Sequence, residues 1–189
     1  MASMARVLVT PVEPAQAPLL ARPYYDQEGA GPLVSSLAHV PEALEVTMPF
    51  IATVLGPSAI GARTKELVIL RTSARLECSY CVQTHSSVAL DSGLSVAEVR
   101  ALRGDGSRRE AFPAEDERIL LDWVDAVAGT VGPVPAGVSV GLRKHFTEAE
   151  VVELTLLCAA TVMLNRYCTA LELPTSAATL QRLAAEGLQ

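Results

Sequence analysis

Apolar residues recur with the period of an α-helix along most of the chain, and no stretch alternates as a half-buried strand would. No internal repeat or low-complexity segment interrupts this pattern. It predicts an all-α fold built as a helical bundle. Helices are expected at 33–55, in one or two pieces broken around Pro41 and Pro49, at 62–76, at 78–92, from Ser95, from Pro113, at 147–173 and at 176–186, with a loop or broken helix at 130–141.

Capping signals mark two of these helix starts. Ser95 is followed three residues later by Glu98, and Thr147 by Glu150, so each pair has the spacing of a capping box. The helix that follows Thr147 is the longest, and its positions 154–164 are apolar on every side. A helix of this kind is expected in the centre of a bundle.

The chain divides into an extended N-terminal arm, residues 1–30, and one all-α domain, residues 31–189. The arm is rich in proline and glycine and would be unstable alone, so we expect it to lie against the domain or a neighbouring subunit. A chain of 189 residues has the ordinary size of one domain and can bury roughly 70% of its unfolded surface.

Charge and hydropathy exclude several classes of partner. A net charge of −6 and a pI of about 5.1 do not suit a nucleic-acid-binding protein, which concentrates Lys and Arg on one face. The longest nearly unbroken apolar run, 154–164, is too short for the ~18 residues of a membrane span. Pro11, Pro14 and Pro18 interrupt any secretory signal, so a cytoplasmic protein is expected. A mean hydropathy of +0.30 favours a homo-oligomer.

The cysteines are too few for a disulfide scaffold: the chain has four. Cys158 and Cys168 fall in one predicted helix, where ten residues put them roughly 15 Å apart, beyond disulfide range. Both are interpreted as small core residues without a chemical role. Cys78 and Cys81, three apart on one helical turn, are close enough to form a disulfide.

Cys78, Cys81 and His85 lie on one face of a predicted helix, at positions i, i+3 and i+7. A thiol at a helix N-terminus has a lowered pKa, and an imidazole one turn along can accept or return a proton. On the preceding helix, Glu66 heads a mostly apolar row, where desolvation would raise its pKa towards that of a general base. Spacing alone does not place Glu66 beside Cys81 or His85.

Plainer interpretations stay open at this point. Two cysteines and a histidine could ligate zinc, although a structural site needs four ligands and no second cluster lies nearby in the sequence. The cysteine pair could be purely structural. Glu66 could be a buried salt-bridge partner of Arg71 or Arg75.

The segment KELVILRTSARLECSYCVQTHSSVAL resembles the core motif of the alkylhydroperoxidase D and carboxymuconolactone decarboxylase superfamily, in its redox-active branch. The motif is a Glu, eleven residues, Cys-x-x-Cys, three residues and a His, here Glu66, Cys78, Cys81 and His85. The resemblance extends over about 41–101, and more weakly to the helix that carries Asn165 and Arg166.

The resemblance implies an alkylhydroperoxidase D-like helical bundle, assembled as a trimer or hexamer, that reduces hydroperoxides with its thiols. In that scheme Glu66 and His85 relay the proton from Cys81, which attacks the peroxide and becomes a sulfenic acid. Cys78 resolves it as the Cys78–Cys81 disulfide, and an external dithiol such as a lipoyl-bearing protein restores both thiols. No metal or organic cofactor is implied.

One departure from the family's pattern is Tyr80, because some peroxidase members carry a His before the second cysteine. Tyr is a poor base at neutral pH. Two alternatives to a peroxidase are kept: a general thiol–disulfide oxidoreductase that uses the same cysteine pair, and a non-catalytic, small-molecule-binding oligomer in which the motif is idle. Lactone decarboxylation is less expected, because that branch generally lacks the cysteine pair.

Overall fold

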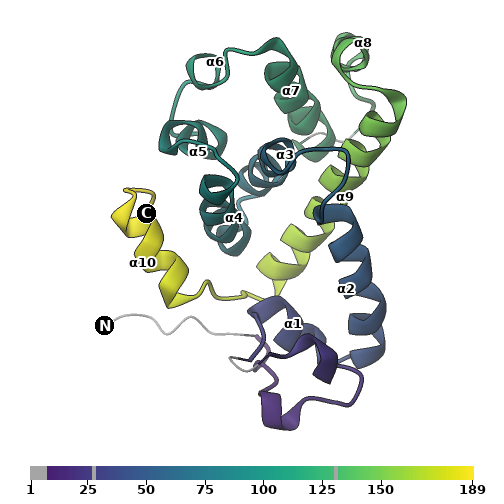
Figure 1. Ribbon diagram of the computed structural model, residues 1–189, viewed down its shortest axis with the longest axis vertical. Helices are drawn as coiled ribbons and strands as arrows, with labels where there is room; N and C mark the ends of the chain where they lie inside the picture. Colours follow the sequence, from purple (N-terminus) through teal and green to yellow (C-terminus); the bar gives the residue numbers. More distant parts are fainter. Residues whose placement is uncertain (1–7, 27–28, 130–131) are drawn as a thin grey trace.

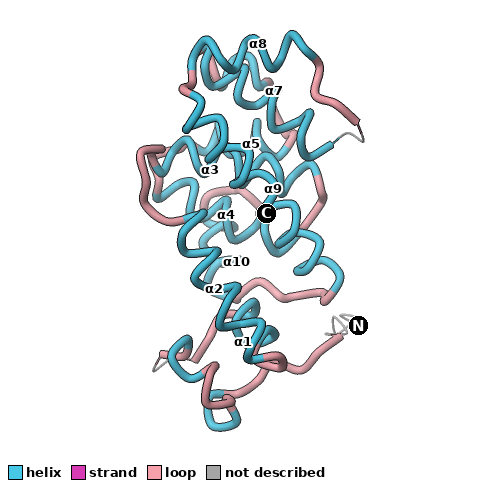
Figure 2. Tube along the Cα trace, turned by 90° about the vertical axis from the view of Figure 1, so that its right-hand side faces the viewer, coloured by secondary structure: helices cyan, strands magenta, loops and turns pink. Residues whose placement is uncertain are grey.

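The computed structural model describes residues 8–26, 29–129 and 132–189, and in these ranges the fold is all-α, as predicted (Figure 1). Figure 2 shows helices and loops in the described part of the chain and no strand. The helices are α1 (Pro32–Leu37), α2 (Pro41–Leu55), α3 (Ala62–Arg75), α4 (Ser79–Asp91), α5 (Val96–Arg103), α6 (Arg108–Ala111), α7 (Glu115–Gly129), α8 (Ala136–His145), α9 (Glu148–Ala170) and α10 (Ala177–Ala185).

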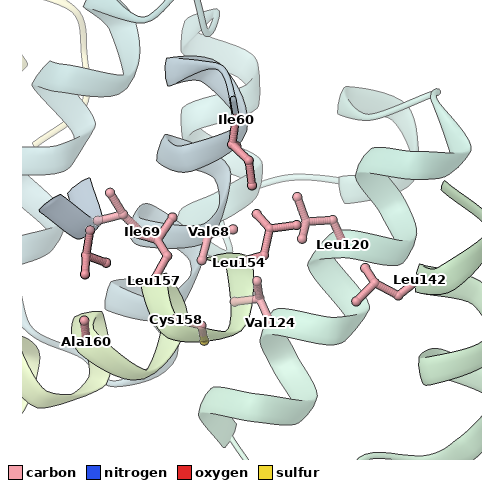
Figure 3. Packing of buried hydrophobic residues seen from close by; sticks show 11 residues of the cluster. Ile60, Val68, Ile69, Leu120, Val124, Leu142, Leu154, Leu157, Cys158 and Ala160 are labelled. Atoms are coloured by element: carbon pink, nitrogen blue, oxygen red, sulfur yellow. The ribbon is translucent and has the colours of Figure 1, made fainter. Parts of the chain in front are cut away.

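Helix α3 is the centre of the bundle, since it packs against α4, α5, α7 and α9. One apolar cluster fills the space between α3, α7 and α9 and includes Val68, Leu120, Leu154 and Cys158 (Figure 3). A second lies on the other side of α3 among α4, α5 and α10. With neighbours on both sides, α3 buries Glu66 along with its apolar residues.

Buried Lys65 joins three helices on the α2 side of the bundle. Its Nζ donates to the carbonyls of Val54 at 3.1 Å and Gly56 at 2.6 Å, at the C-terminal end of α2, where a cation is favoured. The same ammonium lies 3.1 Å from Glu153 on α9. These contacts fix α2 and α9 relative to α3.

Both predicted capping boxes are present, at Ser95 with Glu98 and at Thr147 with Glu150. The expected break at Pro49 is wrong, because Pro49 lies inside α2. Proline removes one hydrogen bond, the one to the carbonyl of Glu45. That carbonyl is exposed and accepts instead from the hydroxyl of Tyr24, at 3.5 Å, so the helix continues.

The expected loop or broken helix at 130–141 is only partly right. Residues 130–131 lie outside the described ranges, and 132–135 are not helical, but α8 begins at Ala136. A Cβ on Gly141 would lie 2.6 Å from Cδ1 of Ile119 on α7. This glycine therefore permits close packing of two helices, whereas in the sequence it is typical of a loop.

The described part of the predicted N-terminal arm contains two short 3-10 turns, Pro14–Gln16 and Arg22–Tyr24. It lies against α1 and α2, where Ala21 is buried with Leu37 and Leu44. The hydroxyl of Tyr25 donates to the carbonyl of Val12 at 2.9 Å. Residues 1–7 of the arm fall outside the described ranges.

Helix α9 is less central than its sequence predicts. It is buried against α2, α3 and α7 on one side, but on the other side Val152, Leu156 and Met163 are exposed. Val46 and Phe50 are exposed on the neighbouring α2. By length and composition α9 could cross a membrane, a test that core helices of soluble proteins also pass.

Candidate active site

The turn between α3 and α4 places the first cysteine. Helix α3 ends in a Schellman motif, in which the N–H of Cys78 donates to the carbonyl of Ser73 and the N–H of Glu77 to that of Ala74. Glu77 adopts the left-handed conformation that this motif needs, with φ 54°. The chain then reverses at once, so that Cys78 is the N-cap of α4.

Cys78 and Cys81 form a close pair of thiols. Their sulfurs lie 2.9 Å apart, within hydrogen-bonding distance. Both residues are buried, and neither is in a disulfide. A disulfide bond measures about 2.05 Å, so closing it requires only a small movement within one helical turn.

Hydrogen bonds place negative charge on Cys78 rather than on Cys81. Interactions with the thiols of Cys168 and Cys81, the hydroxyl of Thr169 and the backbone N–H of Cys81 lower the pKa of Cys78 well below its ordinary value. Interactions with Cys168 and Cys78, together with burial, raise the pKa of Cys81 far above its ordinary value. The N-cap position supports this assignment, because the positive end of the α4 dipole favours a thiolate there. Both effects favour the thiolate at Cys78 and the protonated thiol at Cys81.

Glu66 reaches His85, which the sequence alone did not establish. Nδ1 of His85 on α4 lies 3.0 Å from Oε2 of Glu66 on α3. The side chain of Glu66 is 8% exposed and that of His85 is 20% exposed. A carboxylate held against an imidazole in this way fixes the tautomer and can pass a proton through the ring.

The salt bridge considered for Glu66 is absent from the described contacts of Arg71 and Arg75. Both guanidinium groups are paired with Asp125 of α7, at 2.6 Å for Arg71 and 3.6 Å for Arg75. The carboxylate of Glu66 is therefore left for His85.

Asn165 supports the α3 side of the site. It is buried on α9, and its Nδ2 donates to Oγ of Ser73 at 3.2 Å and to the carbonyl of Thr161 at 2.7 Å. Its Oδ1 is buried without a hydrogen-bond partner in the structure. Its neighbour Arg166 is exposed. Asn165 thus connects α9 to α3 one turn before Cys168.

Cys168, which the sequence analysis interpreted as a core residue without a role, lies beside the thiol pair. It forms a buried cluster with Cys78, Cys81 and Leu173 at the C-terminal end of α9. Its thiol interacts with both other sulfurs, and its hydrogen bond with Cys78, together with burial, raises the pKa of Cys168. A signal was present in the sequence, because Cys168 follows Asn165 by three residues and so shares its helix face.

A cavity of about 510 Å³ opens at this cluster. Cys78 and Cys168 line it, whereas Cys81 and His85 do not. The lining residues come from the start of α4 and from the end of α9 with the loop that follows: Cys78, Ser79, Tyr80, Gln83, Cys168, Thr169, Glu172, Leu173, Pro174 and Thr175.

Tyr80 stands on the wall of this cavity. Burial and the nearby cysteines Cys168 and Cys81 raise its pKa to about 12. Its phenol therefore stays protonated at neutral pH and can donate a hydrogen bond but cannot serve as a base.

Within the described residues, no group of three or more His, Cys, Asp and Glu side chains is arranged to hold a metal ion.

Comparison with known proteins finds a family match in the middle of the chain. Residues 41–121 match the Carboxymuconolactone decarboxylase family. An uncharacterized protein of Mycobacterium tuberculosis is 32% identical over 108 residues, which are 56% of this chain and 37% of that protein. The chain thus matches well under half the length of this relative.

Two solved structures are similar over most of the chain. A protein of unknown function from Agrobacterium tumefaciens, provisionally assigned to antioxidant defence as an AhpD, is 28% identical with a TM-score of 0.68, over 75% of this chain and 96% of its own. The debrominase Bmp8, crystallised with 2,3,4-tribromopyrrole, is 18% identical with a TM-score of 0.77 over 98% of both chains, a likeness of fold. The family match and these structures support the expected resemblance to the superfamily of alkylhydroperoxidase D-like and carboxymuconolactone decarboxylase proteins.

Proposed function

We propose that this protein is a thiol-dependent peroxidase that reduces hydroperoxides through a Cys78–Cys81 dithiol/disulfide cycle. One observation carries the proposal: two free sulfurs 2.9 Å apart share α4 with His85, whose imidazole lies 3.0 Å from buried Glu66. Nucleophile, resolving thiol and proton acceptor are thus present on two adjacent helices.

The first step is attack of Cys81 on the peroxide. Because the pKa of Cys81 is raised, its proton leaves only to a base, and His85 at i+4 with Glu66 behind it supplies one. The Cys81 sulfur takes the terminal oxygen of the peroxide and becomes a sulfenic acid. The alcohol or water leaves with a proton returned by the relay.

The second step forms the disulfide. Cys78 is already ionised, so its sulfur attacks the Cys81 sulfenic acid as soon as that forms, and hydroxide leaves as water after protonation. An external dithiol, for which a lipoyl group is the proposed type, then reduces the disulfide. Cys78 lines the cavity and is the sulfur that this reductant meets.

A general thiol–disulfide oxidoreductase is the second candidate. It is favoured by one observation, that the ionised sulfur, Cys78, lines the cavity whereas Cys81 does not. In that case Cys78 would attack a disulfide substrate directly, and peroxide would be a poor substrate.

Stopped-flow oxidation of the reduced protein tests the proposal. Hydrogen peroxide and cumene hydroperoxide should each remove two thiols per molecule and yield the Cys78–Cys81 disulfide. Cys78→Ser should accumulate a sulfenic acid on Cys81, detected by dimedone labelling, and Cys81→Ser should consume no peroxide. Cys158→Ala is the matched control and should behave as the wild type.

Other outcomes identify the alternatives. Reduction of disulfide substrates without peroxide turnover would favour the oxidoreductase. A cysteine pair that stays inert and titrates near pH 8.5 would favour a small-molecule-binding protein, because no feature would then be activating the sulfur.

We also propose that the protein is a cytoplasmic homo-oligomer. The exposed apolar side chains of α2 and α9, among them Phe50, Leu156 and Met163, support the assembly, because these two helices pack against each other and could bury the side chains in an interface. Light scattering should give a mass above that of one chain, and Leu156→Glu should lower it. A monomeric wild type would contradict the proposal.

A further inference from the structure

Three of the four cysteines meet at one place, although they come from two distant parts of the sequence. Cys78 and Cys81 lie at the start of α4, and Cys168 lies in the last turn of α9. All three are buried and form one cluster with Leu173. The two-thiol cycle proposed above uses the α4 pair and leaves Cys168 without a role.

The ends of the two helices give these sulfurs opposite preferences. Cys78 caps the N-terminus of α4, where the helix dipole favours a negative charge. Cys168 lies at the C-terminus of α9, where the dipole disfavours one. The two helix ends thus favour a thiolate at Cys78 and a protonated thiol at Cys168, and the pKa of Cys78 is lowered whereas that of Cys168 is raised.

The cavity distinguishes the possible disulfides of the cluster. Cys78 and Cys168 both line it, and Cys81 does not. A Cys78–Cys81 disulfide therefore presents one sulfur to a molecule in the cavity. A Cys78–Cys168 disulfide would present both, in a cavity that Gln83 and Thr175 also line.

We propose that Cys168 is a third redox thiol, which attacks the Cys78 sulfur of the Cys78–Cys81 disulfide and so moves the disulfide to Cys78 and Cys168. This rests on the proposed function. The new Cys78–Cys168 bond forms as the Cys78–Cys81 bond breaks, and the proton lost by Cys168 is balanced by the one that Cys81 gains. The number of disulfides does not change, so the step needs no further oxidant.

This exchange would separate the two tasks of the site. Cys81 returns to its thiol form on the helix that carries His85, where the peroxide reaction takes place. The disulfide meanwhile lies on the cavity wall, where an external dithiol can attack it. Cys168 thus connects the buried chemistry to the surface that the reductant reaches.

Disulfide mapping of the full-length protein tests the proposal. Reduced wild type is oxidised with one equivalent of diamide, which removes two electrons and two protons from a pair of thiols whether or not the protein is a peroxidase. Free thiols are then blocked with N-ethylmaleimide at low pH, and the protein is cut with chymotrypsin. Cleavage after Tyr80 and Tyr167 separates all three cysteines, so that each linked pair has its own mass.

The expected result is a Cys78–Cys168 peptide beside the Cys78–Cys81 peptide in the wild type. Cys81→Ala should still lose two thiols and give the Cys78–Cys168 peptide, while Cys158→Ala should match the wild type. Circular dichroism confirms that each variant is folded. If the wild type gives the Cys78–Cys81 peptide alone and folded Cys81→Ala keeps all its thiols, the proposal is overturned.

A rate measurement gives a second test on a protein with the α4 pair intact. Cys168→Ala should still be oxidised by peroxide to the Cys78–Cys81 disulfide, but the reduction of that disulfide by dihydrolipoamide should be slowed roughly fivefold or more. An unchanged reduction rate would overturn the role of Cys168. If instead peroxide fails to react while diamide still yields both disulfides, the proposed peroxidase function fails and the three-thiol exchange stands.

Discussion

Cys158 and Cys168 stand ten residues apart on one helix and are both almost fully buried, yet their surroundings differ completely. Cys158 lies in the apolar cluster between α3, α7 and α9, where its sulfur meets the hydroxyl of Thr72 at 3.4 Å and burial raises its pKa (Figure 3). Cys168 lies against two other sulfurs and a cavity. Burial and position on the helix therefore do not distinguish the two cysteines. The residues that the neighbouring helices pack against each sulfur do.

The largest difference in peroxide turnover is expected between a substitution in the thiol cluster and one in the apolar cluster around Cys158. Cys81→Ser should lower peroxide turnover by at least about 100-fold, because the attacking sulfur is lost. Cys158→Ala should leave turnover unchanged and lower the free energy of unfolding by about 1 kcal/mol, because a buried contact is lost. Turnover is followed by peroxide consumption and stability by urea unfolding. A Cys158→Ala protein that is folded but inactive would remove the distinction between the two regions.

The proton relay should give the next largest effect. Glu66→Gln keeps the shape of the side chain but removes the negative charge beside His85, so oxidation by peroxide should slow roughly 10- to 100-fold. Thermal unfolding should change little. Arg71→Gln is the matched control on the same helix, because it breaks the pair with Asp125 without touching His85. Equal rates for Glu66→Gln and the wild type would exclude Glu66 from the relay.

The two regions should also differ in how their thiols respond to pH. A lowered pKa keeps Cys78 ionised as the pH falls, so its reaction with iodoacetamide should stay nearly constant from pH 9 to about pH 5. An ordinary thiol would lose roughly tenfold in rate per pH unit below about pH 8.5. Cys158 should stay unlabelled throughout, because its pKa is raised and it is buried. Mass spectrometry of the labelled peptides gives both profiles.

The pH dependence of labelling also tests whether Cys168 acts on Cys78. Cys168→Ala removes the largest contribution to the lowered pKa of Cys78, so labelling of Cys78 at pH 5 should fall in this variant. Cys158→Ala, ten residues earlier on α9, should leave it unchanged. Identical labelling of Cys78 in both variants would mean that Cys168 does not act on Cys78.

The smallest effect is expected at the turn that carries Cys78. Glu77 has φ 54° and is exposed, and a left-handed conformation costs a residue with a Cβ about 1 kcal/mol. Glu77→Gly should therefore raise the free energy of unfolding by up to about 1 kcal/mol with turnover unchanged. Urea unfolding measures the change, and a loss of stability would show that the Glu77 side chain makes contacts that outweigh the strain.

The sequence was sufficient for most of the fold. The helical period and the capping residues at Ser95 and Thr147 gave the all-α architecture and the helix starts. Errors occurred where a distant contact overrides a local preference. Tyr24 compensates Pro49 in α2, and the close approach of Ile119 explains Gly141 in α8.

For the site too, spacing along one helix was predictable from the sequence, whereas contacts between helices were not. Cys78, Cys81 and His85 share one helix, so their spacing in the sequence already predicted a common face. The contact of Glu66 with His85 required the packing of α3 on α4, which spacing does not determine. Cys168 is 87 residues from Cys81 in the chain, so the motif alone does not reveal its place in the site. The lowered pKa of Cys78 depends on Cys168 and could not be derived from the motif either.

The end of α9 repeats the turn at the end of α3. The N–H of Leu173 donates to the carbonyl of Cys168 and that of Glu172 to Thr169, with Glu172 left-handed at φ 53°. The sulfurs of Cys78 and Cys168 are therefore positioned by main-chain bonds that do not depend on the side chains at 77 and 172. Glycine or asparagine could replace Glu77 and Glu172 during evolution without moving the thiols. A search for Cys-x-x-Cys alone would overlook a third cysteine that is positioned in this way.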